Sequence, residues 1–166
     1  AESSYMLANG QGKSRANKDG TVRLVPEWRL LFLSSGEISL EQKLQEDGRR
    51  YMAGQAVRVI DIPADAGQGF GIFETLHQFP GGKEFSEHIR RAAERYYGAP
   101  LRAFLDAFTT SLPESSARTR ELLKGFEAHL CPPQADGQVQ RAVKRFALMA
   151  TAGELAVEYG IFPWES

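Results

Sequence analysis

Apolar and polar positions follow different patterns in the two halves of the chain. In the second half, apolar residues recur at every third or fourth position, which is the spacing of one face of an α-helix. This spacing predicts four helices, around residues 85–96, 101–108, 122–130 and 138–159. In the first half, a helix is expected to end within residues 2–9, and a short one is predicted over Ser39–Asp47, with Ser39 as N-cap and Gly48 at its end.

Two apolar runs in the first half predict β-strands. Trp28–Ser34 contains four consecutive apolar residues, Leu30–Leu33, a pattern typical of a strand covered on both faces of a parallel sheet. Ala56–Ile62 is rich in β-branched residues and predicts a second strand. Between residues 10 and 25 the chain is polar, and Asn17–Gly20 predicts a hairpin turn because Asp-Gly favours tight turns. We therefore expect an α/β first half and a helical second half.

The composition is that of an ordinary globular protein, with 166 residues, 42% hydrophobic and 25% charged. The formal net charge is −1, so any contact with nucleic acid requires a local basic patch. No apolar run approaches the ~20 residues that cross a bilayer, and we expect no membrane partner. The single cysteine, Cys131, excludes an intramolecular disulfide and fits a cytoplasmic setting. Because the chain begins without Met and within an amphipathic run, we interpret it as a piece of a longer protein.

A local basic patch lies in the predicted hairpin. Lys13, Arg15, Lys18 and Arg23 are close together in the sequence, and Asp19 is the acid among them. A flexible basic hairpin can follow a phosphate backbone through its charges and backbone amides. The alternative is a solvated turn with ordinary surface cations.

Other motifs that resemble ligand sites are incomplete. Gly12-Lys13-Ser14 matches the end of a phosphate loop, but the position that requires the first glycine is Leu7, and the segment follows a predicted helix rather than a strand. Gly67–Gly71 resembles a dinucleotide fingerprint only loosely, and an independent nucleotide-binding enzyme is a second rival interpretation. The three histidines are too far apart in the sequence to predict a zinc site, so we expect no metal ligands.

Three residues at the predicted strands are candidates for catalysis. Ser34 and Ser35 follow the first strand, where ligands of open parallel sheets bind, and could contact a phosphate or an attacking water. A turn or helix cap before Ser39 is the alternative. Arg58 lies inside the second strand and could offset charge in phosphoryl transfer, or could form a structural ion pair.

Four segments together resemble a known protein family. They are Tyr5–Ala16, Trp28–Glu37, Ala53–Gly67 and Arg145–Ala156. They are similar to the domain of unknown function family 927, which is found in proteins of phages, plasmids and integrative elements. Members of that family look like phosphate-loop ATPases of the helicase type, and the resemblance covers nearly the whole chain.

The resemblance implies a fold and an activity. Residues 1–80 would be the C-terminal half of an ATPase-like α/β core, a partial sheet of the P-loop ATPase type with a basic hairpin over 10–25, and residues 81–166 would be a helical extension. The parent protein would be a helicase-like ATPase of a mobile element, using ATP and Mg²⁺ on DNA as a homo-oligomer. This chain lacks both Walker segments, so alone it is expected to be inactive and to need no cofactor.

The resemblance also assigns roles to individual residues. Lys13, Arg15 and Lys18 would contact DNA, Ser35 would occupy the polar sensor position, and Arg58 would complete a neighbouring nucleotide site. The alternative function is a non-enzymatic helical domain that binds nucleic acid or protein.

Overall fold

The computed structural model describes Met6 and residues 9–164, and contacts divide the chain into two compact units, Ala1–Ile62 and Pro63–Ser166. This division falls earlier than the boundary expected at residue 80. The helix expected within residues 2–9 lies outside the described residues, apart from Met6 and Asn9.

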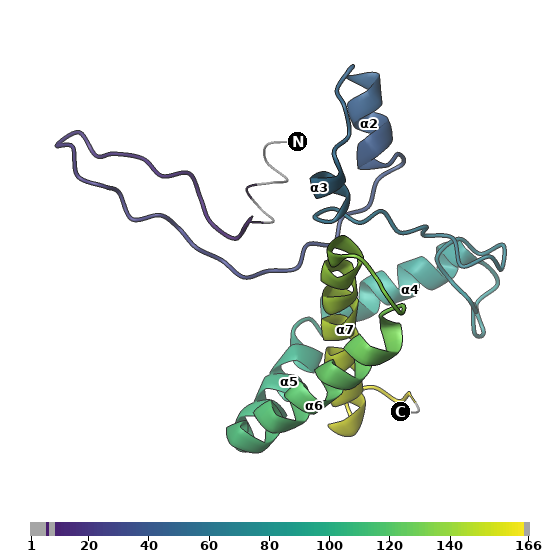
Figure 1. The fold of residues 1–166 in the computed structure, drawn as a ribbon. Coiled ribbons are helices and arrows are strands. Elements are labelled where there is room, and N and C mark those ends of the chain that lie inside the picture. Colours follow the sequence, from purple (N-terminus) through teal and green to yellow (C-terminus); the bar gives the residue numbers. More distant parts are fainter. Residues whose placement is uncertain (1–5, 7–8, 165–166) are drawn as a thin grey trace. The chain divides into compact units, whose positions relative to one another are not determined.

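The first unit contains two short helices, α2 (Leu40–Glu46) and α3 (Ala53–Ala56) (Figure 1). Helix α2 confirms the prediction from the sequence. The Ser39 hydroxyl accepts a hydrogen bond from the Gln42 backbone N–H at 3.0 Å, which satisfies one of the free donors of the first turn. Gly48 has a φ of 66° and closes the other end, a conformation in which a side chain would be strained.

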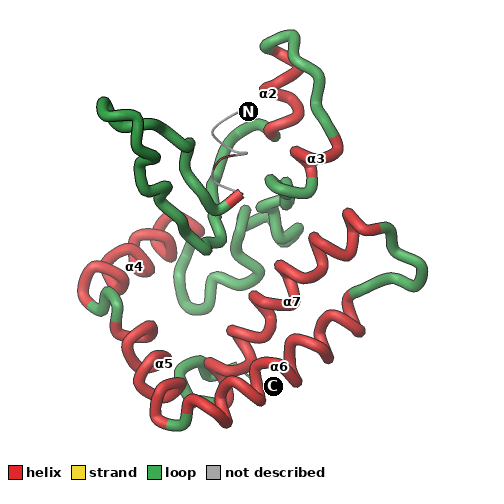
Figure 2. Tube along the Cα trace, turned by 60° about the vertical axis from the view of Figure 1, so that its left-hand side comes forward, coloured by secondary structure: helices red, strands yellow, loops and turns green. Residues whose placement is uncertain are grey.

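The predicted sheet is wrong. Among the described residues there are helices and loops but no strand, apart from two isolated antiparallel bridges, as Figure 2 shows. Leu30–Leu33 is an extended segment in which every side chain is at least half exposed, and Leu33 is 95% exposed. An apolar run forms a strand only when a neighbouring strand takes up its backbone hydrogen bonds, and the structure places none there.

The first part of the second predicted strand is the end of α3 and a helical turn, and residues 60–62 are irregular. The Gln55 side chain accepts from the Met52 backbone N–H at 2.8 Å, and the Gln55 carbonyl accepts from the N–H groups of Arg58 and Val59, both at 2.9 Å. These bonds continue α3 into a turn over the residues that were expected to extend. Local hydrogen bonds therefore override the strand preference of the β-branched residues, which is weak without a partner strand.

Residues 10–28 form a long hairpin with two antiparallel arms, here called the basic ribbon (Figure 1). Its arms pair antiparallel at Gln11 with Glu27 and at Ala16 with Val22. The chain reverses at Asn17–Gly20, the four residues at which the sequence predicts a turn, and Gly20 has the positive φ of 79° that such turns need.

The second unit contains the four predicted helices, and the third of them begins well before residue 122, where it was predicted to start. They are α4 (Gly82–Arg95), α5 (Ala99–Thr110), α6 (Leu112–Leu130) and α7 (Gly137–Glu158). Helices α6 and α7 lie side by side along their lengths, and α5 packs on α6 (Figures 1 and 2). No helix of the described chain is long and apolar enough to cross a membrane.

The interface between α6 and α7 forms the core of the second unit. From α7, it buries Ala147, Thr151, Leu155 and Ala156. From α6, it buries Ser115, whose Oγ accepts a hydrogen bond from the Tyr159 hydroxyl at 3.2 Å. Four of these five buried side chains are small, which lets the two helix backbones approach closely, and Leu155 is the large apolar residue among them.

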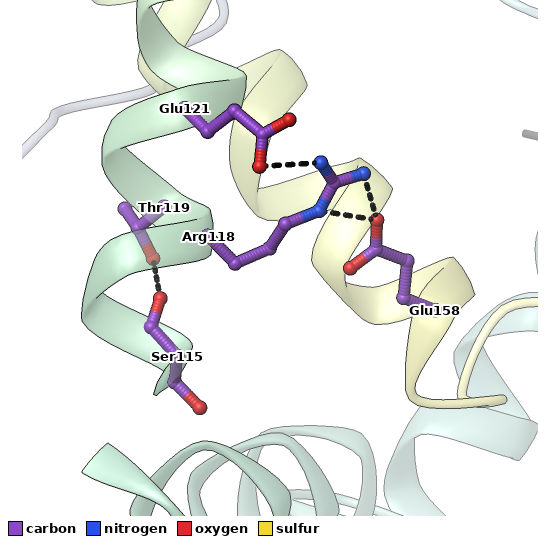
Figure 3. Close-up of polar contacts among 5 residues, drawn as sticks. All are labelled: Ser115, Arg118, Thr119, Glu121 and Glu158. Carbon is purple, nitrogen blue, oxygen red and sulfur yellow. Dashed lines mark hydrogen bonds and ion pairs between the residues drawn. The ribbon is translucent and has the colours of Figure 1, made fainter. Parts of the chain in front are cut away.

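An ion-pair cluster also joins the two helices (Figure 3). The Arg118 guanidinium on α6 donates to Glu158 Oε1 on α7 from Nε at 3.0 Å and from Nη2 at 2.6 Å. Its Nη1 lies 2.9 Å from a carboxylate oxygen of Glu121. The hydrogen bonds to Glu158, and to a smaller extent the bond to Glu121, raise the pKa of Arg118 above its ordinary value.

Candidate nucleic-acid interface

The base of the basic ribbon requires a glycine. The Trp28 backbone N–H donates to the Gly10 carbonyl at 2.8 Å, and the Gly12 N–H donates to Pro26 at the same distance. Gly10 has a φ of +72°, and a Cβ on it would lie 2.6 Å from the Trp28 carbonyl oxygen. Gly10 and Gly12 therefore hold two strand arms together. They do not form a phosphate loop, which would open a helix.

The turn at the tip of the basic ribbon uses the only acid of the predicted patch. Asp19 Oδ1 accepts from the Thr21 hydroxyl at 2.6 Å and from the Thr21 backbone N–H at 3.0 Å. Both bonds lower the pKa of the Asp19 carboxyl below its ordinary value, and the bond from the Thr21 hydroxyl has the larger effect. Asn17 donates to the same hydroxyl at 2.8 Å. The turn is thus ordered by its own side chains, and Lys18 projects from it as an exposed residue.

Two arginines face each other across the middle of the basic ribbon. The Arg23 backbone N–H donates to the Arg15 carbonyl at 2.9 Å, so the two residues are direct cross-strand neighbours. Side chains of such a pair lie on the same face, with Cα atoms about 5.5 Å apart. Both are exposed, and neither has an ion-pair partner among the residues the structure describes.

Three cations of the basic ribbon line one hollow of about 490 Å³. Lys13, Arg15 and Arg23 line it, together with Met6, Gly12, Leu24 and Pro26. The structure therefore brings together two of the three predicted nucleic-acid residues, Lys13 and Arg15, and leaves Lys18 at the tip. It adds Arg23, which the sequence places in the basic patch but which only the cross-strand register places beside Arg15.

Ser35 and Arg58 occupy different kinds of position. Ser35 is exposed in an irregular segment. Arg58 is partly buried, and its guanidinium donates to the Gly54 carbonyl at 2.8 Å and to Asn9 Oδ1 at 3.4 Å. Arg58 therefore ties the start of the basic ribbon to α3. The sensor and arginine-finger roles presuppose a sheet that the described residues do not form, so these roles are predictions without structural support.

No metal site accompanies the basic ribbon: no group of three or more histidine, cysteine or acidic residues in the described ranges could hold an ion. Comparison of the chain with family models, with curated proteins and with solved structures finds no match. The likeness to family 927 therefore stays a prediction that rests on the four segments quoted above.

Proposed function

We propose that this chain binds nucleic acid through the cations of the basic ribbon. The single observation that carries the proposal is the direct pairing of Arg15 with Arg23. Like charges placed directly opposite each other destabilise a strand pair. A phosphate between the two guanidiniums offsets that repulsion, because arginine presents a planar fork of donors that matches phosphate oxygens.

The shape of the basic ribbon supports the same proposal. A two-stranded ribbon fits the major groove of DNA, and a basic groove can also follow a single strand. Lys13 lines the same hollow as the arginine pair, so the hollow is lined by three cations. For a single strand, three contacts correspond to a slope of about −2 when the logarithm of the binding constant is plotted against the logarithm of salt concentration.

Substitution of the arginine pair tests the proposal. The probe is a fluorescein-labelled 20-nucleotide DNA, and anisotropy is measured between low and moderate salt. Arg15→Gln together with Arg23→Gln is expected to weaken binding about tenfold or more and to reduce the salt slope from about −2 to about −1.

A matched control separates the site from net charge. Arg49→Gln together with Arg50→Gln removes the same charge from exposed residues of the same unit that follow α2. This variant should bind as the wild type does. Equal weakening by the two double variants, or no affinity of the wild type even at low salt, would refute the proposal.

The wider assignment to a helicase-like ATPase of mobile elements is supported by the resemblance alone. It implies DNA as the nucleic acid and a parent protein that uses ATP and Mg²⁺. DNA binding by the basic ribbon is compatible with that parent, and equally with the alternative of a non-enzymatic binding domain. The arginine-pair experiment tests binding in both cases.

A further inference from the structure

Residues 29–37, here called the 29–37 segment, combine exposed apolar side chains with a charge at each end. The segment begins with Arg29, ends with Glu37, and contains Leu30–Leu33 between them. All four of these apolar side chains are at least half exposed. We infer that the 29–37 segment pairs antiparallel with the same segment of a second copy of this chain, with Leu33 of each copy at the two-fold axis.

The backbone of the 29–37 segment is open to a partner strand (Figure 1). Its N–H and carbonyl groups form no hydrogen bond within the part of the chain that the structure describes. Unpaired backbone groups beside exposed apolar side chains are the features through which an edge strand recruits another strand. A second copy would take up these backbone groups, as no other segment of the described first unit does.

The two end charges favour a second copy in antiparallel orientation. Arg29 and Glu37 are exposed, and neither forms an ion pair among the described residues. In a parallel pair of such segments, like charges lie opposite each other, which destabilises the pair. In an antiparallel pair centred on Leu33, each Arg29 lies opposite Glu37 of the other copy, because both are four positions from the centre. The segment is therefore complementary in charge to a second copy of itself.

The same register brings the apolar side chains together. On one face of an antiparallel pair, side chains meet directly opposite each other and diagonally, two positions along. One face would carry a continuous stripe of Leu31 and Leu33 from both copies, and on the other face the two copies of Phe32 would be diagonal neighbours. A pair about a two-fold axis uses the same surface on both copies, so the assembly closes at two chains.

The exposed apolar surface is sufficient for a weak dimer. The exposed fractions are 65% for Leu30, 53% for Leu31, 54% for Phe32 and 95% for Leu33. At roughly 100 Å² for a fully exposed side chain, each copy offers on the order of 300 Å² of apolar surface. Interfaces of this size belong to weak, transient complexes, so we expect dissociation in the micromolar range or above. The pairing needs no nucleic acid and is independent of the proposed function.

Sedimentation of the full chain without nucleic acid tests the pairing. The wild type is measured at low salt over roughly 1 µM to 1 mM, the range of weak association. With rising concentration it should change from a species of 18.4 kDa to one of twice that mass. No larger species is expected, because a two-fold pair is closed.

Charge reversal at the ends of the segment tests the orientation. Arg29→Glu alone, or Glu37→Arg alone, places like charges opposite each other at both ends and should weaken dimerisation about 5- to 30-fold. The two substitutions in one chain exchange the partners of each pair, so the double variant should dimerise as the wild type does. Arg50→Glu is the matched control, because Arg50 is an exposed arginine of the same unit outside the segment. It makes the same change in net charge and should leave dimerisation unchanged.

A cysteine at the two-fold axis tests the register. Cys131→Ser first removes the single native cysteine. In that background, Leu33→Cys places two thiols directly opposite each other, within the Cα separation that a disulfide spans, and mild oxidation should link the two chains. Leu31→Cys is the matched control, because its two copies would lie four positions apart along the pair, about 13 Å, which is too far for a disulfide.

Each outcome supports or overturns the inference. A wild type that stays monomeric at the highest concentration overturns it, and so does growth beyond two copies. Failure of the double charge variant to restore dimerisation also overturns it, as does equal cross-linking of Leu31→Cys and Leu33→Cys. Because nucleic acid is absent from all three measurements, none of these results affects the proposed function, which the arginine-pair variant tests separately.

Discussion

Thr151 offers a direct test of how the helical unit is held together. It lies in the interface of α7 with α6, is 1% exposed, and its hydroxyl has no hydrogen-bond partner among the described residues. Other helical threonines bond to the carbonyl four residues earlier, as Thr119 does to Ser115 at 2.7 Å (Figure 3). Replacement of Thr151 by valine removes the unpaired hydroxyl and keeps the branched shape.

The magnitude follows from burial. A buried hydroxyl that has lost water without gaining a partner costs about 1 to 3 kcal/mol. Valine and threonine have similar helix propensities, so the backbone contributes little to the change. We expect Thr151→Val to raise the free energy of unfolding of the second unit by about 1 to 2 kcal/mol, which corresponds to about 5 to 9 °C in Tm.

The assay is urea unfolding followed by far-ultraviolet circular dichroism, with the slope m compared between variants. An unchanged m with a higher midpoint shows a true gain in stability. Thr119→Val is the matched control, since it makes the same chemical change at a hydroxyl that is bonded. That variant should lose about 0.5 to 1.5 kcal/mol.

Two results would refute the reasoning. If Thr151→Val and Thr119→Val shift the midpoint equally and in the same direction, the hydroxyl of Thr151 is not unpaired in solution. A loss of stability in Thr151→Val would mean that the hydroxyl has a partner, such as a buried water.

Two further predictions concern the helix cap and nucleotide hydrolysis. Asp136 caps α7 by accepting hydrogen bonds from the backbone N–H groups of Val139 and Gln138. Both bonds lower the pKa of its carboxyl below the ordinary value of 3.8, and the bond from Val139 has the larger effect. The stability that this cap contributes is present above that value and is lost as the pH falls through the lower, folded pKa. Between pH 5 and pH 2 the wild type should therefore lose more in Tm than Asp136→Asn, and parallel profiles would contradict the assignment. In a phosphate-release assay with ATP, the chain should show no magnesium-dependent turnover above background, because Gly10–Ser14 belongs to the basic ribbon; robust turnover would restore the phosphate-loop interpretation.

The helices could be predicted because their signals are local. The apolar spacing of the second half, the Ser39 cap and the Gly48 stop all act within one or two turns, and each acts as predicted. The tight turn at Asn17–Gly20 is local in the same way, because the bonds that hold it come from Asn17, Asp19 and Thr21.

The sheet could not be decided from the sequence because a strand is defined by its neighbour. Leu30–Leu33 and Ala56–Ile62 have the composition of buried strands, and composition cannot show whether another strand lies alongside. The first of these runs is exposed, and the second folds into the turn after α3 through bonds to the Gln55 carbonyl.

The same distinction between local and non-local features applies to the candidate site. The amino-acid sequence by itself determined the basic character of residues 13–23, because charge is a property of composition. Only the tertiary structure decided that Arg15 faces Arg23 and that Arg58 anchors Asn9 rather than facing a nucleotide. The physical reason is that these relations join residues distant in the chain, and their geometry depends on cross-strand register and on packing, which no local pattern of residues encodes.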